Sequence, residues 1–436
     1  MSDSPAVQPL SPAAIREQLA TMRELRARIA QVNEKYADRP RESFGAPEPP
    51  TPRPPMRYIE EWLTGGEVET KYGRHFETEK LWESHKRHGS ADIGALLDLP
   101  HDLLETISDG ICPKTSPEEW AFLDTETTGL AGGTGTAAFL IGVGSITKEG
   151  FRVRQFFMRD YAEEPSQLDA LARYLEPFRV LITYNGRTFD QPLLETRFRL
   201  NRTRPPFARM EHLDLLFGAR RLWKLRFDSC RLVDLENQIL GIERQGDIPG
   251  ALIPYLYFEY LRTHEAARLL PVFHHNALDI VTLACLTGIV PFAFRDPHNA
   301  PFRHGAEIAG IARWLRDAGE TEQARTLFRR SIDHGLRDEV LFRTMWDLAQ
   351  VDRKLGAESE ALATWIDLSS AKNPFRVKAL EELAKHYEHR AKDLAKALEA
   401  TQSALKLEET PALRHRESRL LKKTWDRLQR LASMTG

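Results

Sequence analysis

The apolar and polar positions divide the chain into a part that mixes strands with helices and a part that is helical throughout. Short apolar runs bounded by turn residues lie at residues 122–124, 136–144, 151–157 and 180–184. Such runs predict strands, and the turn at residues 148–150 predicts an antiparallel hairpin of the second and third. A helical pattern at about 167–175 precedes the last run, and others begin at Phe189. We therefore expect an α/β fold, a mixed sheet with helices packed on it.

Beyond about residue 300 the pattern is helical, and small residues recur at nearly constant intervals. Three pairs are 37 residues apart, namely Gly319 and Gly356, Ala312 and Ala349, and Ala324 and Ala361. Ala384 and Ala397 follow their counterparts by 35 and 36 residues and mark a third copy. Small residues at fixed places let paired helices approach closely, and a period slightly above 34 resembles tetratricopeptide repeats. An ordinary helical bundle is the alternative interpretation.

Changes in composition indicate four parts. Residues 1–55 hold ten of the 26 prolines and predict an amphipathic helix followed by a proline-rich linker. That helix either pairs with another chain or folds back on its own protein. The remaining parts are a small extension packed on the next domain at 56–115, the α/β domain at 116–298 and the helical repeat domain at 299–436.

Composition and charge exclude several classes of protein. The chain has 61 basic and 63 acidic side chains, so it does not hold nucleic acid by bulk positive charge, although local basic clusters remain. Its 3 cysteines are too far apart for a zinc CxxC pair or a disulfide framework. The start shows no secretory signal, and the longest uncharged apolar stretch, residues 280–294, is shorter than the ~20 residues that span a bilayer. We expect a cytoplasmic protein.

Two carboxylates stand at the end of the first predicted strand. Asp124 and Glu126 are two residues apart, so both side chains project from the same face of the sheet. Like charges this close raise each other's proton affinity unless a cation lies between them. A divalent metal ion is the cation that this pair suits, whereas a solvated pair or a helix cap is the alternative.

Two further acidic residues occur beside apolar segments. Asp190 follows the turn at Asn185-Gly186 in the first turn of a helix, where an acid also suits the helix dipole. The apolar face of that helix leaves Asp190 pointing toward the strand end. Asp279 lies four residues after His275 on an apolar helix, so the two share a face. Four carboxylates from one strand and two helices suit two Mg²⁺ or Mn²⁺ ions about 3.5 to 4 Å apart, the arrangement that catalyses phosphoryl transfer.

With these acids the chain resembles the DEDD exonucleases of ribonuclease-H-like fold, and among them the YprB-type predicted exonucleases with tetratricopeptide-like repeats. The resemblance covers about residues 60–295 and includes Phe139-Leu-Ile-Gly142, His212-Leu-Asp-Leu-Leu216, Ser229-Cys-Arg-Leu232 and Asp247-Ile-Pro-Gly250. It implies that the α/β domain degrades single-stranded RNA or DNA from the 3′ end. It also implies four metal carboxylates: Asp124 shared by both ions, Glu126 and Asp279 on the nucleophile's ion, and Asp190 acting through water.

The resemblance further implies that a histidine or tyrosine of the last motif deprotonates the attacking water. Two spacings between this residue and the last Asp are compatible with the sequence. One subgroup places its histidine five residues before the last Asp, which selects His274. The other places a tyrosine four residues before it, which selects His275. We favour His275, because a four-residue step on a helix puts it over Asp279, whereas five residues turn His274 about 140° away. If the helix starts later, a loop delivers His274 instead.

Several residues are candidates for substrate contacts. By resemblance, Thr127, Thr128 and Leu130 hold the terminal nucleotide, and we add Asn185 and Arg187. Five basic residues lie between positions 220 and 231, and from this segment we select Arg220, Arg221 and Trp223 to follow the phosphate backbone and stack a base. A solvated helix face is the alternative. A second basic run at 414–430 either extends this track or keeps the end of the chain soluble.

Two functions are compatible with these patterns. The first is a nuclease that hydrolyses phosphodiester bonds, with a repeat domain that guides the substrate or docks a protein partner. The second is a scaffold, in which a catalytically weak nuclease-like domain binds nucleic acid while the repeats recruit proteins. Adjacent repelling carboxylates favour the enzyme, because a pure binding module has no use for them. An endonuclease needs only a wider entrance to the same metals.

Overall fold

The computed structural model of the chain describes residues 58–129 and 135–435, with side chains described as far as residue 430. The helix and linker predicted for residues 1–55, and the predicted substrate contact Leu130, lie outside the described residues. The described residues belong to one unit of the chain, which is distinct from residues 1–56.

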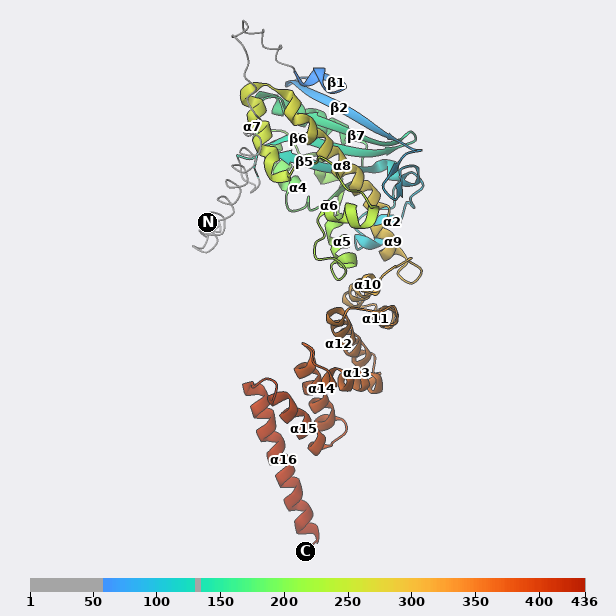
Figure 1. The fold of residues 1–436 in the computed structure, drawn as a ribbon, viewed down its shortest axis with the longest axis vertical. Helices are drawn as coiled ribbons and strands as arrows, with labels where there is room; N and C mark the ends of the chain where they lie inside the picture. The colour runs from blue at the N-terminus through green and yellow to red at the C-terminus, as the bar shows by residue number, and fades with distance from the viewer. Residues whose placement is uncertain (1–57, 130–134, 436) are drawn as a thin grey trace, which may run out of the picture. The chain divides into compact units, whose positions relative to one another are not determined.

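A seven-stranded mixed sheet forms the first part of this unit (Figure 1), in the strand order β1-β2-β7-β6-β5-β8-β9. The strands are β1 (Gly65–Thr70), β2 (Gly73–Glu83), β5 (Trp120–Thr127), β6 (Ala138–Thr147), β7 (Gly150–Phe157), β8 (Val180–Thr183) and β9 (Glu211–Asp214), and a separate small pair consists of β3 (Arg87–His88) and β4 (Ala91–Asp92). Strand β8 is parallel to β5 and β9, and the other neighbours are antiparallel. The predicted α/β fold with a mixed sheet is confirmed.

The sheet is wider than the apolar runs indicate. Strands β5 to β8 and the β6–β7 hairpin lie where the sequence predicts them, with Thr147 opposite Gly150 at the turn. Strands β1 and β2 come from the region 56–115, expected to be only a small extension, and β2 pairs along β7 from Phe76 to Glu83. Residues 65–70 and 73–83 are therefore part of the sheet itself.

Helices cover both faces of the sheet. They are α2 (Leu103–Ile107), α3 (Glu164–Tyr174), α4 (Asp190–Leu200), α5 (Leu215–Trp223), α6 (Leu232–Leu235), α7 (Ile253–Thr263), α8 (Leu270–Thr287) and α9 (Val290–Arg295), with short helical turns at Ile59–Glu61, Gly94–Leu96, Pro117–Glu119, Tyr161–Glu163, Pro206–Arg209, Glu236–Leu240, Gly250–Leu252 and Ala266–Leu269. Alternate side chains of β5 separate two cores. Ala121 and Leu123 pack with α3 and α4, whereas Trp120 and Phe122 pack with α5 and α8.

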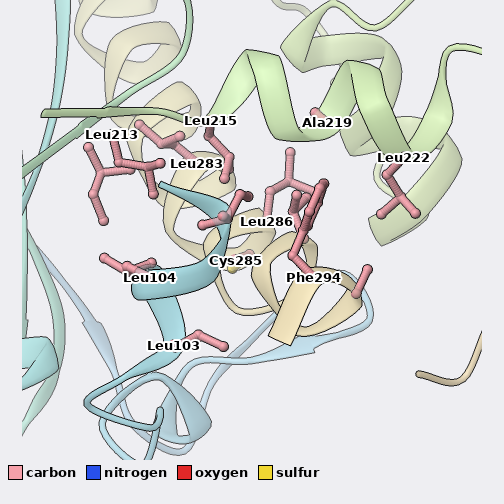
Figure 2. Packing of buried hydrophobic residues seen from close by; sticks show 14 of the residues in the cluster. Leu103, Leu104, Leu213, Leu215, Ala219, Leu222, Leu283, Cys285, Leu286 and Phe294 are labelled. Atoms are coloured by element: carbon pink, nitrogen blue, oxygen red, sulfur yellow. The ribbon is translucent and has the colours of Figure 1, made fainter. Parts of the chain in front are cut away.

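Figure 2 shows the second of these cores. Side chains from five elements meet there: Leu103 and Leu104 of α2, Leu213 of β9, Leu215, Ala219 and Leu222 of α5, Leu283, Cys285 and Leu286 of α8, and Phe294 of α9. The helical stretch Ala266–Arg295, which includes α8, is long and apolar enough to cross a membrane by length and composition alone. However, 72% of its most apolar window is buried inside the fold. Its apolar composition is therefore explained by packing on the sheet.

After residue 300 the described chain is all-helical, as the sequence predicts. The helices are α10 (Gly305–Asp317), α11 (Thr321–Asp333), α12 (Asp338–Lys354), α13 (Glu358–Ser370), α14 (Arg376–His389), α15 (Leu394–Leu405) and α16 (Pro411–Thr435). All six alanines of the recurring positions are fully buried: Ala312, Ala324, Ala349, Ala361, Ala384 and Ala397. Small side chains at these positions let successive helices pack closely. The assignment to tetratricopeptide repeats stays a prediction.

The turns inside the helix pairs share one backbone conformation. Gly319 and Gly356 have φ values of +90° and +77°, in the left-handed region that glycine adopts without strain. The third copy has Lys392 at this place, with φ +56°. The structural repeat therefore continues where the glycine of the sequence repeat is lost.

Glu307 of α10 joins the helical region to the sheet region. Its side chain is buried and accepts hydrogen bonds from Trp223 Nε1 at 3.1 Å and Arg226 Nη1 at 2.6 Å. Its other oxygen accepts from the backbone N–H groups of Arg303 and His304. Because a buried carboxylate is stable only when its hydrogen bonds are made, Trp223 and Arg226 are committed to this junction.

Candidate active site

The first two carboxylates project from the end of β5. Asp124 and Glu126 lie on the same face of the sheet as Trp120 and Phe122, because side chains alternate along a strand. Helix α8 packs across this face and carries Asp279. The strand and the helix together bring three of the four predicted carboxylates to one edge of the sheet.

Asp190 reaches the same edge from the other face. It is the first residue of α4, and its Oδ1 accepts a 2.5 Å hydrogen bond from the Thr125 hydroxyl. The turn that leads to it has Asn185 at φ +69°. The Asp214 carboxylate holds this turn by accepting from the backbone N–H groups of Asn185 at 2.7 Å and Arg187 at 3.2 Å. A buried acid at the end of β9 therefore fixes the start of α4.

The acids at this edge are buried, and several of them act on one another electrostatically. Burial, with the charges of Asp279 and Asp190, raises the pKa of Asp124 well above its usual range. Burial and the charges of Asp124, Asp279 and Asp190 do the same to the pKa of Glu126. Burial raises the pKa of Asp190 to about 6, against the hydrogen bond from Thr125. The structure thus brings together all four acids that the sequence selects.

An amide supports Asp124 from α8. Asn276 is completely buried and donates from Nδ2 to Asp124 Oδ2 at 2.9 Å. The orientation of this amide is fixed, because its Oδ1 accepts a 2.8 Å hydrogen bond from Gln155 Nε2 on β7. Gly142 on β6 makes room for it, since a Cβ there would stand 2.2 Å from Asn276 Oδ1.

A buried guanidinium supports Asp279. Arg244 is 3% exposed and donates to Asp279 Oδ1 at 2.5 Å, to Glu236 Oε2 at 2.5 Å and to Asp247 Oδ2 at 3.2 Å. Burial raises the pKa of Asp279, and the positive charge of Arg244 opposes that rise. One guanidinium thus serves three carboxylates, which leaves the group as a whole with an excess of negative charge.

The two histidines at the start of the motif differ in their surroundings. Helix α8 begins at Leu270, so both histidines are helical and the four-residue step holds. His275 is partly buried, with Nδ1 at 2.7 Å from Asp247 Oδ1 and Nε2 at 3.8 Å from Asp279 Oδ2. His274 is exposed. The geometry places His275, rather than His274, beside the carboxylates.

The donor set suits a hard divalent cation. Glu126 is 8% exposed, yet no hydrogen-bond donor of the described residues reaches its carboxylate. A buried acid without a donor is costly unless a cation serves it, and carboxylate oxygens are the ligands that Mg²⁺ and Mn²⁺ prefer. Within residues 58–129 and 135–435, no three Asp, Glu, His or Cys side chains are arranged so that they could hold a metal ion. Asp124, Asp190 and Asp279 are instead turned toward Asn276, Thr125 and Arg244.

The predicted substrate contacts fall into two groups. Thr127 donates to the carbonyl of Gly129, and Thr128 accepts from the N–H of Ala137, so both hydroxyls brace the loop after β5. Asn185 is partly buried at the turn before α4. The exposed cations are Arg187, Arg220 and Arg221.

Trp223 corrects one prediction. Its indole is 2% exposed and donates to Glu307, so it offers no face on which a base can stack. The ring belongs to the core between α5 and α10. The exposed aromatic side chain on α5 is Phe217, at 47% exposure.

Comparisons with known proteins agree with this arrangement. Residues 121–290, from β5 to the start of α9, match the RNase_H superfamily. Membership of that superfamily indicates a nuclease-type function, which implies nucleic acid as the partner. Over 286 residues the chain is 36% identical to the uncharacterized protein YprB of Bacillus subtilis (strain 168), an alignment that covers 65% of this chain and 68% of that protein. The chain belongs to the YprB family.

Proposed function

We propose that the chain is a divalent-metal-dependent nuclease that removes nucleotides from the 3′ end of single-stranded nucleic acid. The observation that carries the proposal is the convergence of four carboxylates at one edge of the sheet, where neighbouring acids raise the pKa of Asp124 and Glu126. Repelling acids are destabilising unless they serve a cation, so their assembly supports a metal site. The 3′ polarity and the DEDD type rest on the resemblance of the sequence motifs.

In this proposal Asp124, Glu126, Asp190 and Asp279 hold two Mg²⁺ or Mn²⁺ ions. Such ions, when bound, stabilise the negative charge on the attacking and leaving oxygens of phosphodiester hydrolysis. Asn276 keeps the Asp124 carboxylate in one rotamer, and Arg244 does the same for Asp279. Both are positioning residues that act through the carboxylates.

His275 is the proposed general base. The 2.7 Å contact between its Nδ1 and Asp247 Oδ1 assigns the Nδ1 proton to that hydrogen bond. The lone pair of Nε2 is then on the side of the four acids, where it takes the proton of the attacking water. Asp247 orients the imidazole in the same way as the acid of a carboxylate–histidine pair.

The test is degradation of 5′-labelled single strands of RNA and DNA by the purified chain with Mn²⁺ or Mg²⁺. A ladder of products shortened from the 3′ end is expected, and it disappears with Asp124→Asn. Linear and circular strands are compared, because an exonuclease leaves circles intact. Cleaved circles would contradict the exonuclease, and intact substrates of every kind would leave the scaffold as the better account.

A further inference from the structure

Helix α5 carries an exposed stripe that includes the predicted substrate contacts Arg220 and Arg221. Phe217, Arg220, Arg221 and Lys224 occupy positions i, i+3, i+4 and i+7 and are all exposed. This spacing puts four side chains on one face of a helix. Ala219, Leu222 and Trp223 are buried on the opposite side. We call these four residues the α5 stripe.

The cations of the α5 stripe are unpaired. In the described part of the chain, no ion pair or side-chain hydrogen bond is made by Arg220, Arg221 or Lys224. Their neighbours behave differently, because Arg226 is bound to Glu307 and Arg231 to Asp234. Three free positive charges within about 6 Å of helix rise, on a chain with a net charge of −2, form a local site for a polyanion.

The α5 stripe lies beside the strand end that holds the carboxylates. The parallel register of Phe122 with Ile182 carries Asp124 alongside Tyr184, on the same face of the sheet. Tyr184 donates to the carbonyl of Cys230. The positive charge of Arg220 is close enough to lower the pKa of Tyr184 against the rise caused by burial. Tyr184 therefore lies next to the strand position of Asp124 and within range of the charge of Arg220.

We propose that the α5 stripe binds the single-stranded substrate, with Arg220, Arg221 and Lys224 on successive phosphates and Phe217 stacked on a base. This inference rests on the proposed nuclease function. The stripe spans about 10 Å along the helix, the length of about three stacked nucleotides. An exposed phenyl ring among cations binds bases without regard to sequence, as a nuclease of low sequence specificity requires. An acidic segment of a protein partner would bind the three cations but would not need the Phe217 ring.

Binding is measured separately from cleavage, with Asp124→Asn protein and fluorescent 12-mers of single-stranded DNA and RNA, by anisotropy over a series of salt concentrations. For the parent, the logarithm of the association constant falls linearly with the logarithm of salt. In the triple variant Arg220→Ala, Arg221→Ala, Lys224→Ala we expect the slope to be smaller by about 2, since each phosphate contact contributes about 0.7. Phe217→Ala is expected to weaken binding about tenfold with the slope unchanged.

A matched control removes three other exposed cations. Arg202, Arg204 and Arg209 are exposed and follow the far end of α4 from Asp190. Their triple alanine variant changes the net charge equally and is expected to change the slope by less than about 0.5 if local contacts decide it. The melting temperature of every variant is recorded, because basic residues at a helix C-terminus also stabilise the helix. A lysine variant, Arg220→Lys with Arg221→Lys, keeps the charges and is expected to keep the slope.

The outcomes separate the inference from the proposed function. Slopes that are equal in the α5 and control variants, at equal melting temperatures, would overturn the inference, as would tighter binding of polyglutamate than of either oligonucleotide. If the variants lose binding as expected while the wild type cleaves nothing, the nuclease proposal fails and the binding surface stands. If the wild type cleaves but the α5 variant binds normally, the nuclease proposal stands and the binding surface is refuted.

Discussion

A single buried acid in the helical region and the group of acids at the end of β5 have opposite surroundings. Glu388 of α14 accepts from three cations of α16, namely Arg416 at 3.1 Å, Arg419 at 2.6 Å and Lys423 at 2.8 Å. Burial alone would raise the pKa of Glu388, but Lys423 and Arg419 lower it below its usual range. Of the four acids at the end of β5, only Asp279 accepts from a guanidinium in the described structure, that of Arg244, and the pKa values of Asp124 and Glu126 are raised.

The difference separates structural acids from functional ones. A carboxylate that fastens two helices is matched by positive charge within the protein, so that its ionised form is stable in the folded state. An acid whose charge is left for an outside cation is destabilising in the folded chain. Three of the seven Lys and Arg residues in the basic run 414–430 are thereby assigned: Arg416, Arg419 and Lys423 are bound to Glu388 rather than free for a substrate.

The largest expected effect is at the carboxylate shared by both proposed ions. Asp124→Asn should reduce cleavage by at least about 10³-fold, because a metal ligand is lost. The melting temperature should not fall, since one repelling charge is removed from the group. Activity on labelled oligonucleotides and thermal unfolding check the two halves. A variant that stays active, or that melts far below the wild type, would show that Asp124 is a structural rather than a functional acid.

The matching substitution in the helical region is expected to act in the opposite way. Glu388→Gln leaves three partly solvated cations without their counter-ion and should lower the free energy of unfolding of the helical region by about 1 to 2 kcal/mol. Cleavage of a short oligonucleotide at temperatures where the variant is folded should be unchanged. Urea unfolding followed by circular dichroism measures the first effect. Loss of activity without loss of stability would show that Glu388 is not merely structural.

Asn276 tests how firmly the functional acids are positioned. Asn276→Ala should lower kcat by about 10- to 100-fold and weaken Mn²⁺ binding, measured by calorimetry, by a similar factor. Gly142→Ala should have the same effect from outside the site, since its Cβ would displace the Asn276 amide. A fall in stability with unchanged Mn²⁺ affinity would reduce Asn276 to a packing residue.

The pH dependence of stability tests His212, a partly buried histidine. Burial lowers the pKa of His212 to about 4; its ring lies between Thr183 and Gln191. Below about pH 6.5 the histidine is protonated in the unfolded chain but stays neutral in the folded chain. Its contribution to the free energy of unfolding is therefore lost as the pH falls toward 4. Relative to His212→Gln, the wild type should lose about 1.5 kcal/mol between pH 8 and pH 5. Urea unfolding at both pH values measures this loss, and an equal loss in the two proteins would contradict the prediction.

The smallest expected effect concerns a turn in the helical region. Lys392 holds φ +56°, a conformation that costs a non-glycine residue about 1 kcal/mol. Lys392→Gly should therefore raise the free energy of unfolding by up to about 1 kcal/mol, whereas Gly356→Ala should lower it by a similar amount. Differential scanning calorimetry of both variants measures the changes. Equal shifts of the same sign would show that backbone conformation does not govern these turns.

The sequence predicted the residues whose chemistry is readable from type and spacing. The strands β5 to β8, the all-helical end and the four acids were identified, because apolar periodicity and carboxylates at strand and helix ends are local signals. The choice of His275 over His274 follows from helical geometry, because α8 includes residue 275. The prediction for Trp223 was wrong, since the partner that buries it, Glu307, is 84 residues away.

The supporting residues could not be predicted, because their partners are remote in the chain. Asn276 acts on Asp124 across 152 residues, and Arg244 acts on Asp279 across 35. Gln155, Asn276 and Gly142 have no local pattern that distinguishes them from surface or turn residues. Asp247 belonged to a motif of the resembled family, yet only its 2.7 Å contact with His275 indicates what it does.

The strands that come first in the chain also set a practical limit for recombinant work. The superfamily match begins at residue 121, but β2 covers the edge of β7 over eight residue pairs, from Phe76 to Glu83. A truncation that starts near residue 116 strips this cover and exposes a row of unsatisfied backbone N–H and C=O groups. Such an edge recruits strands of other molecules, so the shortened protein is expected to self-associate. Expression of the α/β region on its own should therefore begin before Gly65.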